Sequence, residues 1–342
     1  MRRRVLIKAL AATPLALAAP PLLQSARASE VTSVILLKQH GLPYLPLMVM
    51  ENLRLIEKYA EKQGLPAIKT DYKTLGGTGS LVDSLLSGQA NFAVTGVPAL
   101  ATLWDKTVGT PNEVRALSAV QSMPFHLVTH NAAVQSIRDF GTSDKIALPA
   151  VKVSSQAVCL QMAAAKEWGF DQYARLDPLT ISRAHPDAAT AILSKSSEIT
   201  AHYAAAPFYY YELAAPGIRS VLKSYETFGG PKTNGVMLMA KSFRDANPKV
   251  TTAVYLALEE AQTFINANHR QAAEIYIKLT GEKRSTAAEM EKIVADPDNV
   301  WTTTPERSMQ FFMFMHRVGT MKRLPADWTE PFMPEARTLK GS

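Results

Sequence analysis

Residues 68–98 read IKTDYKTLGGTGSLVDSLLSGQANFAVTGVP. Short apolar runs at 68–72 and 92–94 flank a longer amphipathic stretch, which a cluster of glycine and hydroxyl residues opens at 76–80. Pro98 then stands where a second helix would begin, a position at which its fixed φ angle costs no needed hydrogen bond. This alternation of strands and helices is typical of an open, largely parallel sheet that helices cover.

The same alternation continues along the rest of the chain. It predicts further strands and further helices, and after them a proline-rich strap over one lobe. The predicted strands lie at 34–37, 114–120, 145–148, 179–182, 198–201 and 236–240. The predicted helices lie at 46–63, 156–168, 187–194, 208–213, 248–268, 270–279, 286–294 and 306–319.

The length of the chain, 342 residues, exceeds what one hydrophobic core usually serves, so two lobes are expected. The pattern breaks at 122–124 and again at 228–231, a stretch of turn-forming residues. We therefore predict an α/β protein whose lobe I consists of 29–124 and 226–342. Lobe II, at 125–225, would be inserted between the two parts of lobe I.

The first 28 residues have the pattern of a secretory signal peptide. Arg2, Arg3, Arg4 and Lys8 precede an apolar run that ends at Ala26-Arg27-Ala28, an A-x-A cleavage site. The arginines also resemble a twin-arginine signal. This segment holds most of the formal charge of +7, and the remaining chain is nearly neutral, which does not favour nucleic-acid binding. We expect a periplasmic protein with no integral membrane segment in the mature chain.

Ligand-binding residues of an open α/β sheet follow the carboxyl ends of the strands, where loops enter helices. In this chain those positions hold small, hydroxylic and aromatic residues and no acid. Exposed amide groups at helix N-termini favour an oxyanion such as a sulfonate, carboxylate or nitrate. The ordinary alternative is that the hydroxyl residues only cap helices. The candidates are His40, Tyr44, Gly77, Thr78, Thr95, Gly96, Met123, Ser154, Ser155, Gln156, His202 and Tyr203.

Aromatic residues among these candidates leave a second kind of ligand open. Tyr44 and Tyr203, together with Phe125, could stack on a planar solute such as a pyrimidine. The run Tyr209-Tyr210-Tyr211 contributes at most one or two side chains, because consecutive residues of a helix point in different directions.

Enzyme chemistry has little support in the sequence. Cys159 lies among apolar residues of a predicted helix, as a small buried hydrophobe does. The seven histidines show no metal-ligand spacing, and Gly77-x-Gly79 lacks the rest of a nucleotide-binding fingerprint. We expect no cofactor, no metal and no catalysis.

Three segments resemble the nitrate/sulfonate/taurine class of ABC importer binding proteins, which includes aliphatic-sulfonate and thiamine-pyrimidine relatives. They are Gly41-Leu42-Pro43-Tyr44, the stretch 81–93 with Gly96 after it, and Val236-Met237-Leu238-Met239-Ala240 followed by Phe243, Asn247 and Pro248. The resemblance implies the type II periplasmic-binding fold, in which two α/β lobes close on a ligand at a two-segment hinge. It also implies an ABC permease with its ATPase as partner, a monomeric protein, and ligand contacts at Tyr44, Gly77, Thr78, Thr95, Gly96, Ser154, Ser155 and His202.

The chain departs from that class at one place. Thr200-Ala201 and Ala206-Pro207 stand where members often carry an Asp-Ala pair and a Glu-Pro pair, and the loss of both acids disfavours a cationic amine such as that of taurine. Two other functions remain open. One is a secreted enzyme on the same fold with His202 or His40 as its base, and the other is a sensory binding protein that feeds a membrane receptor.

Overall fold

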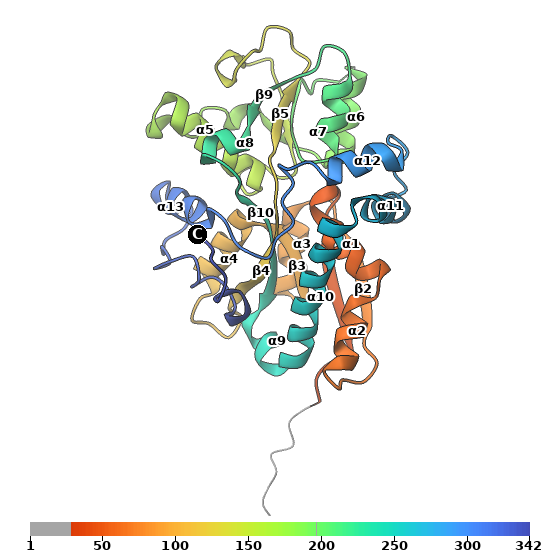
Figure 1. The fold of residues 1–342 in the computed structure, drawn as a ribbon. Helices are drawn as coiled ribbons and strands as arrows, with labels where there is room; N and C mark the ends of the chain where they lie inside the picture. The colour runs from red at the N-terminus through yellow and green to blue at the C-terminus, as the bar shows by residue number, and fades with distance from the viewer. Residues whose placement is uncertain (1–28, 196) are drawn as a thin grey trace, which may run out of the picture.

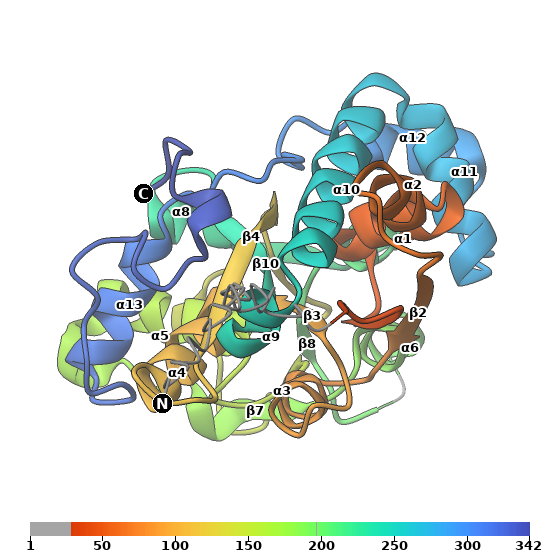
Figure 2. The ribbon, with the colours of Figure 1, turned by 90° about the horizontal axis from the view of Figure 1, so that it is seen from below.

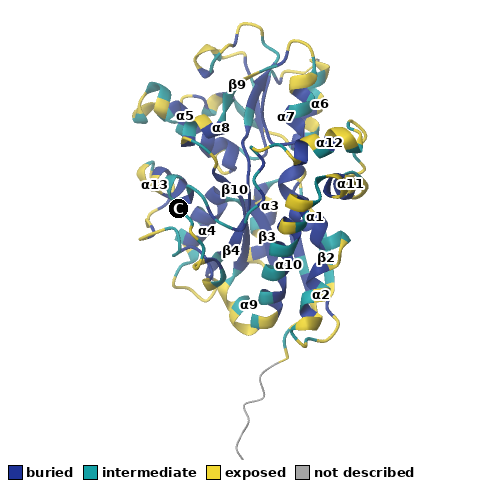
Figure 3. Ribbon diagram, viewed as in Figure 1, coloured by how far each residue is buried: buried dark blue, intermediate teal, exposed yellow. Residues whose placement is uncertain are grey.

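The computed structural model describes residues 29–195 and 197–342, so the expected signal peptide lies outside the described residues. Figure 1 shows two lobes, one above the other, with the chain crossing between them near the centre. Each lobe contains a five-stranded sheet. Figure 3 shows that both sheets are buried along the middle of the molecule while exposed residues lie at the rim.

The sheet of lobe I has the strand order β2-β1-β3-β10-β4. Its strands are β1 (Ser33–Lys38), β2 (Lys69–Thr74), β3 (Phe92–Gly96), β4 (Val114–Ser122) and β10 (Thr233–Ala240). Strand β1 pairs in parallel with β2 and β3, whereas β10 is antiparallel to β3 and β4. All the strands except β10 therefore run in one direction.

Helices cover both faces of this sheet (Figure 2). On one side lie α1 (Leu45–Asn52), α2 (Leu55–Lys62) and α10 (Pro248–Ala267). On the other lie α3 (Thr78–Leu86), α4 (Val97–Thr107) and α13 (Ser308–Arg317), and α9 (Lys241–Ala246) follows β10. Alternate residues of a strand point to opposite faces, so Leu36 joins one apolar cluster and Leu37 the other.

Lobe II has the strand order β7-β6-β8-β5-β9. Its strands are β5 (His126–Thr129), β6 (Ile146–Leu148), β7 (Thr180–Ser182), β8 (Ala201–Ala204) and β9 (Arg219–Lys223). Its α-helices are α5 (Ser155–Trp168), α6 (His185–Ser194), α7 (Phe208–Ala214) and α8 (Ser224–Phe228). Strand β5 is antiparallel to both of its neighbours, so this sheet also has one reversed strand.

The reversed strands are the first ones that the chain forms after each crossing. The chain passes from β4 to β5 on its way out of lobe I, and from β9 through α8 to β10 on its way back. A strand that follows such a crossing enters its sheet from the side of the other lobe. It is therefore antiparallel to the neighbouring strands, which enter from the opposite side. The two α/β lobes that the sequence predicts are present, with this reversed strand as an addition.

The C-terminal region contacts both lobes. Helices α11 (His269–Thr280) and α12 (Ala287–Val294) follow α10. The Tyr210 hydroxyl of lobe II then donates to Asp296 at 2.7 Å, and Val300 pairs with Ser122 at the hinge. The last residues form an irregular strap in which Phe332 pairs with Ala116 at the edge of the lobe I sheet.

Three details differ from the sequence predictions. The helix predicted at 46–63 is broken by Arg54 in the left-handed conformation (φ 52°), which lets α2 turn its own apolar face toward α10. The strand predicted at 198–201 is observed as β8 at 201–204. The prediction began too early because the apolar Ile199 is buried although it lies in the loop before the strand. Strands β5 and β9 were not predicted: β5 lies just after the break at 122–124, and β9 has no fully buried residue to mark it as a strand.

Candidate functional site

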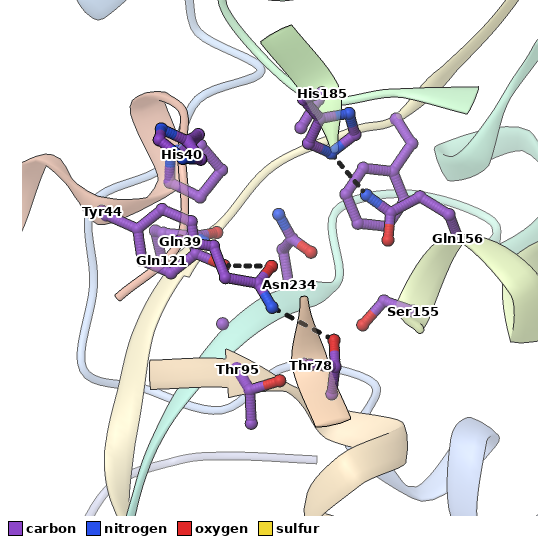
Figure 4. Close-up of a pocket in the computed structure, with 15 residues that line it drawn as sticks. Gln39, His40, Tyr44, Thr78, Thr95, Gln121, Ser155, Gln156, His185 and Asn234 are labelled. Carbon is purple, nitrogen blue, oxygen red and sulfur yellow. Dashed lines mark hydrogen bonds between the residues drawn. The ribbon is translucent and has the colours of Figure 1, made fainter. Parts of the chain in front are cut away.

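A cavity of about 30 Å³ lies between the lobes. Residues at the ends of β1, β3, β4 and β10 of lobe I line it from one side, and residues at the start of α5 and α6 of lobe II line it from the other (Figure 4). Seven of the sequence-predicted residues line this cavity: His40, Tyr44, Thr78, Thr95, Gly96, Ser155 and Gln156. The β and α elements thus bring together residues that lie more than 100 positions apart in the sequence.

The beginnings of four helices surround the cavity. Thr78, Ser155 and His185 are the first residues of α3, α5 and α6, and Gly96 is the N-cap of α4. The first amide groups of a helix have no acceptor within the helix, and the helix dipole places partial positive charge there. The cavity therefore has the electrostatic character that suits an oxyanion.

On the lobe I side, a hydrogen-bonded chain ends at the cavity. The Tyr44 hydroxyl donates to Gln39 Oε1 at 3.1 Å, and Gln39 Nε2 donates to Thr78 Oγ1 at 3.2 Å. Burial raises the pKa of the Tyr44 hydroxyl, so this group stays a neutral donor. Because Thr78 Oγ1 already accepts a bond, its own proton is left to donate toward the cavity.

Gln121, on β4, lines the cavity with a side-chain amide that lacks hydrogen-bond partners. Its side chain is fully buried, and neither Nε2 nor Oε1 has a hydrogen-bond partner among the described residues. An unpaired buried amide of this kind costs about 1–3 kcal/mol. A molecule bound in the cavity would supply the partners that this amide lacks.

On the lobe II side, four buried side chains are linked by hydrogen bonds. Gln156 Nε2 lies 3.0 Å from His185 Nε2, and His185 Nδ1 lies 2.7 Å from His202 Nε2. His202 Nδ1 lies 2.6 Å from Glu212 Oε1. Gln156 and His185 line the cavity, whereas His202 and Glu212 are fully buried behind them. We call this set, Gln156, His185, His202 and Glu212, the buried relay.

A larger depression of about 480 Å³ shares lining residues with the cavity. His40 lines both spaces, and Lys38, Lys283 and Arg284 line the depression together with Glu282. Burial and the nearby Lys38 cation lower the pKa of His40. Basic groups thus line the depression beside the cavity.

Five of the sequence-predicted residues lie next to the cavity without lining it. Gly77 is the N-cap of α3, and the Ser154 hydroxyl caps α5 by accepting from the amide of Ala157 at 3.2 Å. Met123 is buried in an apolar cluster, and Tyr203 is buried edge-on against Phe125. His202 reaches the cavity only through His185 and uses both of its ring nitrogens in the buried relay.

The sequence reasoning missed several residues that line the cavity. Gln121 lies one residue before the first predicted break, and His185 lies at the start of a helix whose beginning was placed at Asp187, so both were within reach. Asn234 is the second residue of β10, the strand after the return crossing, and no local pattern places this strand against β4. The remaining missed lining residues are Gln39, Pro43, Ala205 and Gly235, whereas Phe125, one of the predicted aromatic contacts, does line the cavity.

Cys159 is fully buried, and burial raises its pKa to about 11, so the thiol is not poised for nucleophilic attack. Within residues 29–195 and 197–342 no cluster of three metal-ligating side chains is found. In the same part of the chain, every helix is too short or too polar to cross a membrane.

No family model and no curated protein matches the sequence. Solved structures do match the fold. The alkanesulfonate-binding protein SsuA from Xanthomonas axonopodis pv. citri, bound to MOPS, matches with a TM-score of 0.68 and 16% identity over 87% of this chain and 96% of that one. The periplasmic nitrate-binding protein NrtA from Synechocystis PCC 6803 matches with a TM-score of 0.64 and 15% identity, over 88% and 84%.

The periplasmic aliphatic sulphonate-binding protein SsuA from Escherichia coli also matches, with a TM-score of 0.60 and 15% identity over 86% of this chain and 90% of that one. These likenesses confirm the periplasmic-binding-protein fold that the sequence resemblance implied. The structural neighbours named here come from the nitrate and sulfonate class that the sequence resembles.

Proposed function

We propose that this chain is the extracytoplasmic solute-binding component of an ABC importer and captures a small anionic or aromatic solute by closure of its lobes. Residues 1–28 would direct export to the periplasm, by the twin-arginine route or the general one. The mature protein would act as a monomer that delivers its solute to a permease with its ATPase. Lobe I (29–124 and 226–342) and lobe II (125–225) would rotate about the crossings near 124 and 226.

The observation that carries this proposal is the unpaired Gln121 amide beside a cavity that both lobes line. A buried polar side chain without partners lowers stability, so its presence is best explained by a partner that binds. Four helix beginnings around the same cavity would stabilise an oxyanion. The sulfonate- and nitrate-binding proteins of the same fold support this ligand class.

Contacts between the lobes support capture by closure. The Leu42 amide donates to the Ala206 carbonyl at 2.8 Å, and Gly41, with φ 117°, brings its backbone beside that carbonyl. Such contacts close the cavity to a volume that suits a solute of few atoms, such as nitrate or a short sulfonate. A larger aromatic solute would require the lobes to open further.

A binding screen on the purified mature protein tests the proposal. Nitrate, methanesulfonate, longer alkanesulfonates, aromatic carboxylates and pyrimidines would each be added in a thermal-shift assay, followed by calorimetry. A ligand at about 100 times its Kd stabilises a protein by about 2.7 kcal/mol, which is a shift of several degrees. The Gln121→Leu variant should lose this shift. If the wild-type protein responds to none of these classes, the proposed capture of such solutes is wrong.

An enzyme would need a base that a substrate bound in the same cavity can reach. His202 is enclosed and bonded at both ring nitrogens, so a substrate proton cannot reach it directly. Binding without turnover is the function that we propose, and release of a chemically changed product from any compound found in the screen would contradict it.

A further inference from the structure

The protonation state of Glu212 sets the donor and acceptor of every hydrogen bond in the buried relay. If Glu212 is a carboxylate, Oε1 accepts, so His202 Nδ1 carries the proton and His202 Nε2 must accept. His185 Nδ1 then donates to His202, and His185 Nε2 accepts from Gln156 Nε2. Figure 4 shows this arrangement of the amide, with the nitrogen of Gln156 toward His185 and its oxygen pointing away. In this state Gln156 presents its amide oxygen, a hydrogen-bond acceptor, to the cavity.

One additional proton reverses every bond of the relay. A proton added at His185 Nε2 is matched by transfer of the His185 Nδ1 proton to His202 Nε2, and of the His202 Nδ1 proton to Glu212 Oε1. Both imidazoles remain neutral, and Glu212 becomes a carboxylic acid that donates back to His202 Nδ1. His185 Nε2–H now needs an acceptor, so the Gln156 amide must turn over and present its NH₂ group to the cavity.

The surroundings of the relay favour neutral imidazoles and a carboxyl group that can hold a proton. Glu212 Oε2 has no partner among the described residues, and burial raises the pKa of this carboxyl well above its ordinary value. Burial lowers the pKa of His202 to about 3 and also lowers that of His185, and a positive charge on His202 or His40 would lower the pKa of His185 further. The ring of Phe208 stacks on His185, which is itself buried.

The other charged groups near the relay are few. Arg284 faces Glu212 and favours its carboxylate form, while His40 faces His185 and disfavours an imidazolium there. Lys38 and Asp187 act on His40 with opposite signs. None of these groups forms a hydrogen bond within the relay, so the exchange of one proton remains between Glu212 and the cavity.

We propose that the buried relay is a specificity-determining device, in which one proton decides whether Gln156 offers a hydrogen-bond donor or an acceptor to the bound solute. This inference rests on the proposed function, since it assigns a role within the same cavity. With the extra proton, the cavity binds an acceptor-only anion such as nitrate or methanesulfonate. Without it, the cavity prefers a solute that carries an N–H or O–H group.

The ligand-free protein tests the relay itself. Nitrogen-15 labelling of histidine and long-range proton–nitrogen NMR distinguish an Nδ1–H tautomer from an Nε2–H tautomer. Between pH 5 and pH 9, His185 and His202 should change tautomer together, from Nε2–H at low pH to Nδ1–H at high pH, and neither should show the spectrum of an imidazolium. Fixed tautomers over this range, or an imidazolium at either residue, would overturn the proposal.

Two matched variants locate the proton. Glu212→Gln removes the group that stores it, so the change of tautomer should disappear while the remaining histidine signals are unaffected. Glu198→Gln removes an exposed carboxyl of the same lobe and should leave the change intact. A change of tautomer that persists in Glu212→Gln would place the proton elsewhere and refute the relay. The wild-type titration decides the matter if Glu212→Gln does not fold.

Calorimetry with nitrate and methanesulfonate separates this inference from the proposed function. Above the pH of the tautomer change, each anion should bind with uptake of one proton, and affinity should fall about tenfold per pH unit. Binding without proton uptake in that range would overturn the role of Gln156. If neither anion binds at any pH, the proposed anion capture fails, and the tautomer measurement alone decides whether the relay exists.

Discussion

Gly96 of lobe I and Ser155 of lobe II approach each other so closely that a Cβ atom on Gly96 would lie 1.7 Å from Ser155 Oγ. Gly96 is the N-cap of α4, and Ser155 is the first residue of α5. Two helices from different lobes therefore meet end to end across the cavity, and this contact exists only because residue 96 has no side chain.

Gly96→Ala should hold the lobes apart while each lobe stays folded. Overlap of this size typically costs about 1–3 kcal/mol, and here the lobes can relieve it by separating. We expect a larger radius of gyration in small-angle scattering, and at least about tenfold weaker binding of whichever solute the screen identifies. Gly76→Ala is the matched control, because a Cβ there meets nothing within 4 Å. Equal affinity in the two variants would contradict the role of this contact.

Gln121→Leu should stabilise the protein and abolish binding. Replacing an unpaired buried amide by an apolar group of similar size removes its desolvation cost, so the free energy of unfolding should rise by about 1–2 kcal/mol. The control is Gln262→Leu, since buried Gln262 Nε2 donates to the Val120 carbonyl at 2.8 Å. That variant should be less stable than wild type. Urea denaturation measures both, and a loss of stability in Gln121→Leu would show that its amide has a partner.

Lys232→Met should also raise stability. Lys232 is fully buried, and its Nζ has no hydrogen-bond partner among the described residues and lies 4.2 Å from the centre of the Phe125 ring. Burial lowers the pKa of this amine, so the unfolded chain binds a proton that the folded chain holds less tightly. Stability of the wild type therefore rises with pH up to the ordinary lysine pKa of 10.5.

At pH 7 we expect Lys232→Met to gain about 1–3 kcal/mol in unfolding free energy, and this gain should shrink as the pH approaches 10.5. Lys292→Met, which changes an exposed lysine, should have little effect at any pH. Thermal unfolding between pH 6 and pH 10 provides the measurement. A gain that does not depend on pH would mean that Lys232 is fully charged in its apolar site.

His126 should make the protein less stable in mild acid. Burial, followed by the nearby Lys223 cation, lowers its pKa to about 4 from 6.5. Below pH 6.5 the unfolded chain binds a proton that the folded chain does not, so stability falls until the pH reaches the folded value. This shift corresponds to a loss of up to about 3 kcal/mol.

His126→Phe keeps an aromatic ring beside Tyr209, whose ring centre lies 4.3 Å from that of His126, but it cannot titrate. The difference in unfolding free energy between pH 7 and pH 4 should therefore be smaller in this variant. Urea titrations at both pH values measure that difference, and an unchanged value would mean that His126 is accessible to solvent protons.

The fold followed from local patterns because the forces that create a βα unit are local. Period-two and period-3.6 apolar repeats, glycine clusters and helix-entry prolines each act within a few residues, and they placed most strands and helices of both lobes. The same patterns located His40, Thr78, Gly96 and Ser155 at the ends of strands, where a sheet of this kind exposes them. The candidate site could be predicted in this respect.

Only the tertiary structure decides which of these strand ends meet at the cavity. Gln121 and Asn234 reach the cavity because β10 returns to pair with β4 more than 100 residues later, and no local pattern encodes that pairing. Met123 directly follows β4 and Tyr203 lies within β8, but both side chains are buried in the apolar clusters and not in the cavity, because neighbouring residues of an extended chain point to opposite faces. The buried relay is likewise a product of packing. The hydrogen bonds from Gln156 to Glu212 require four separate elements, α5, α6, β8 and α7, to meet, and the sequence records only the residues that take part.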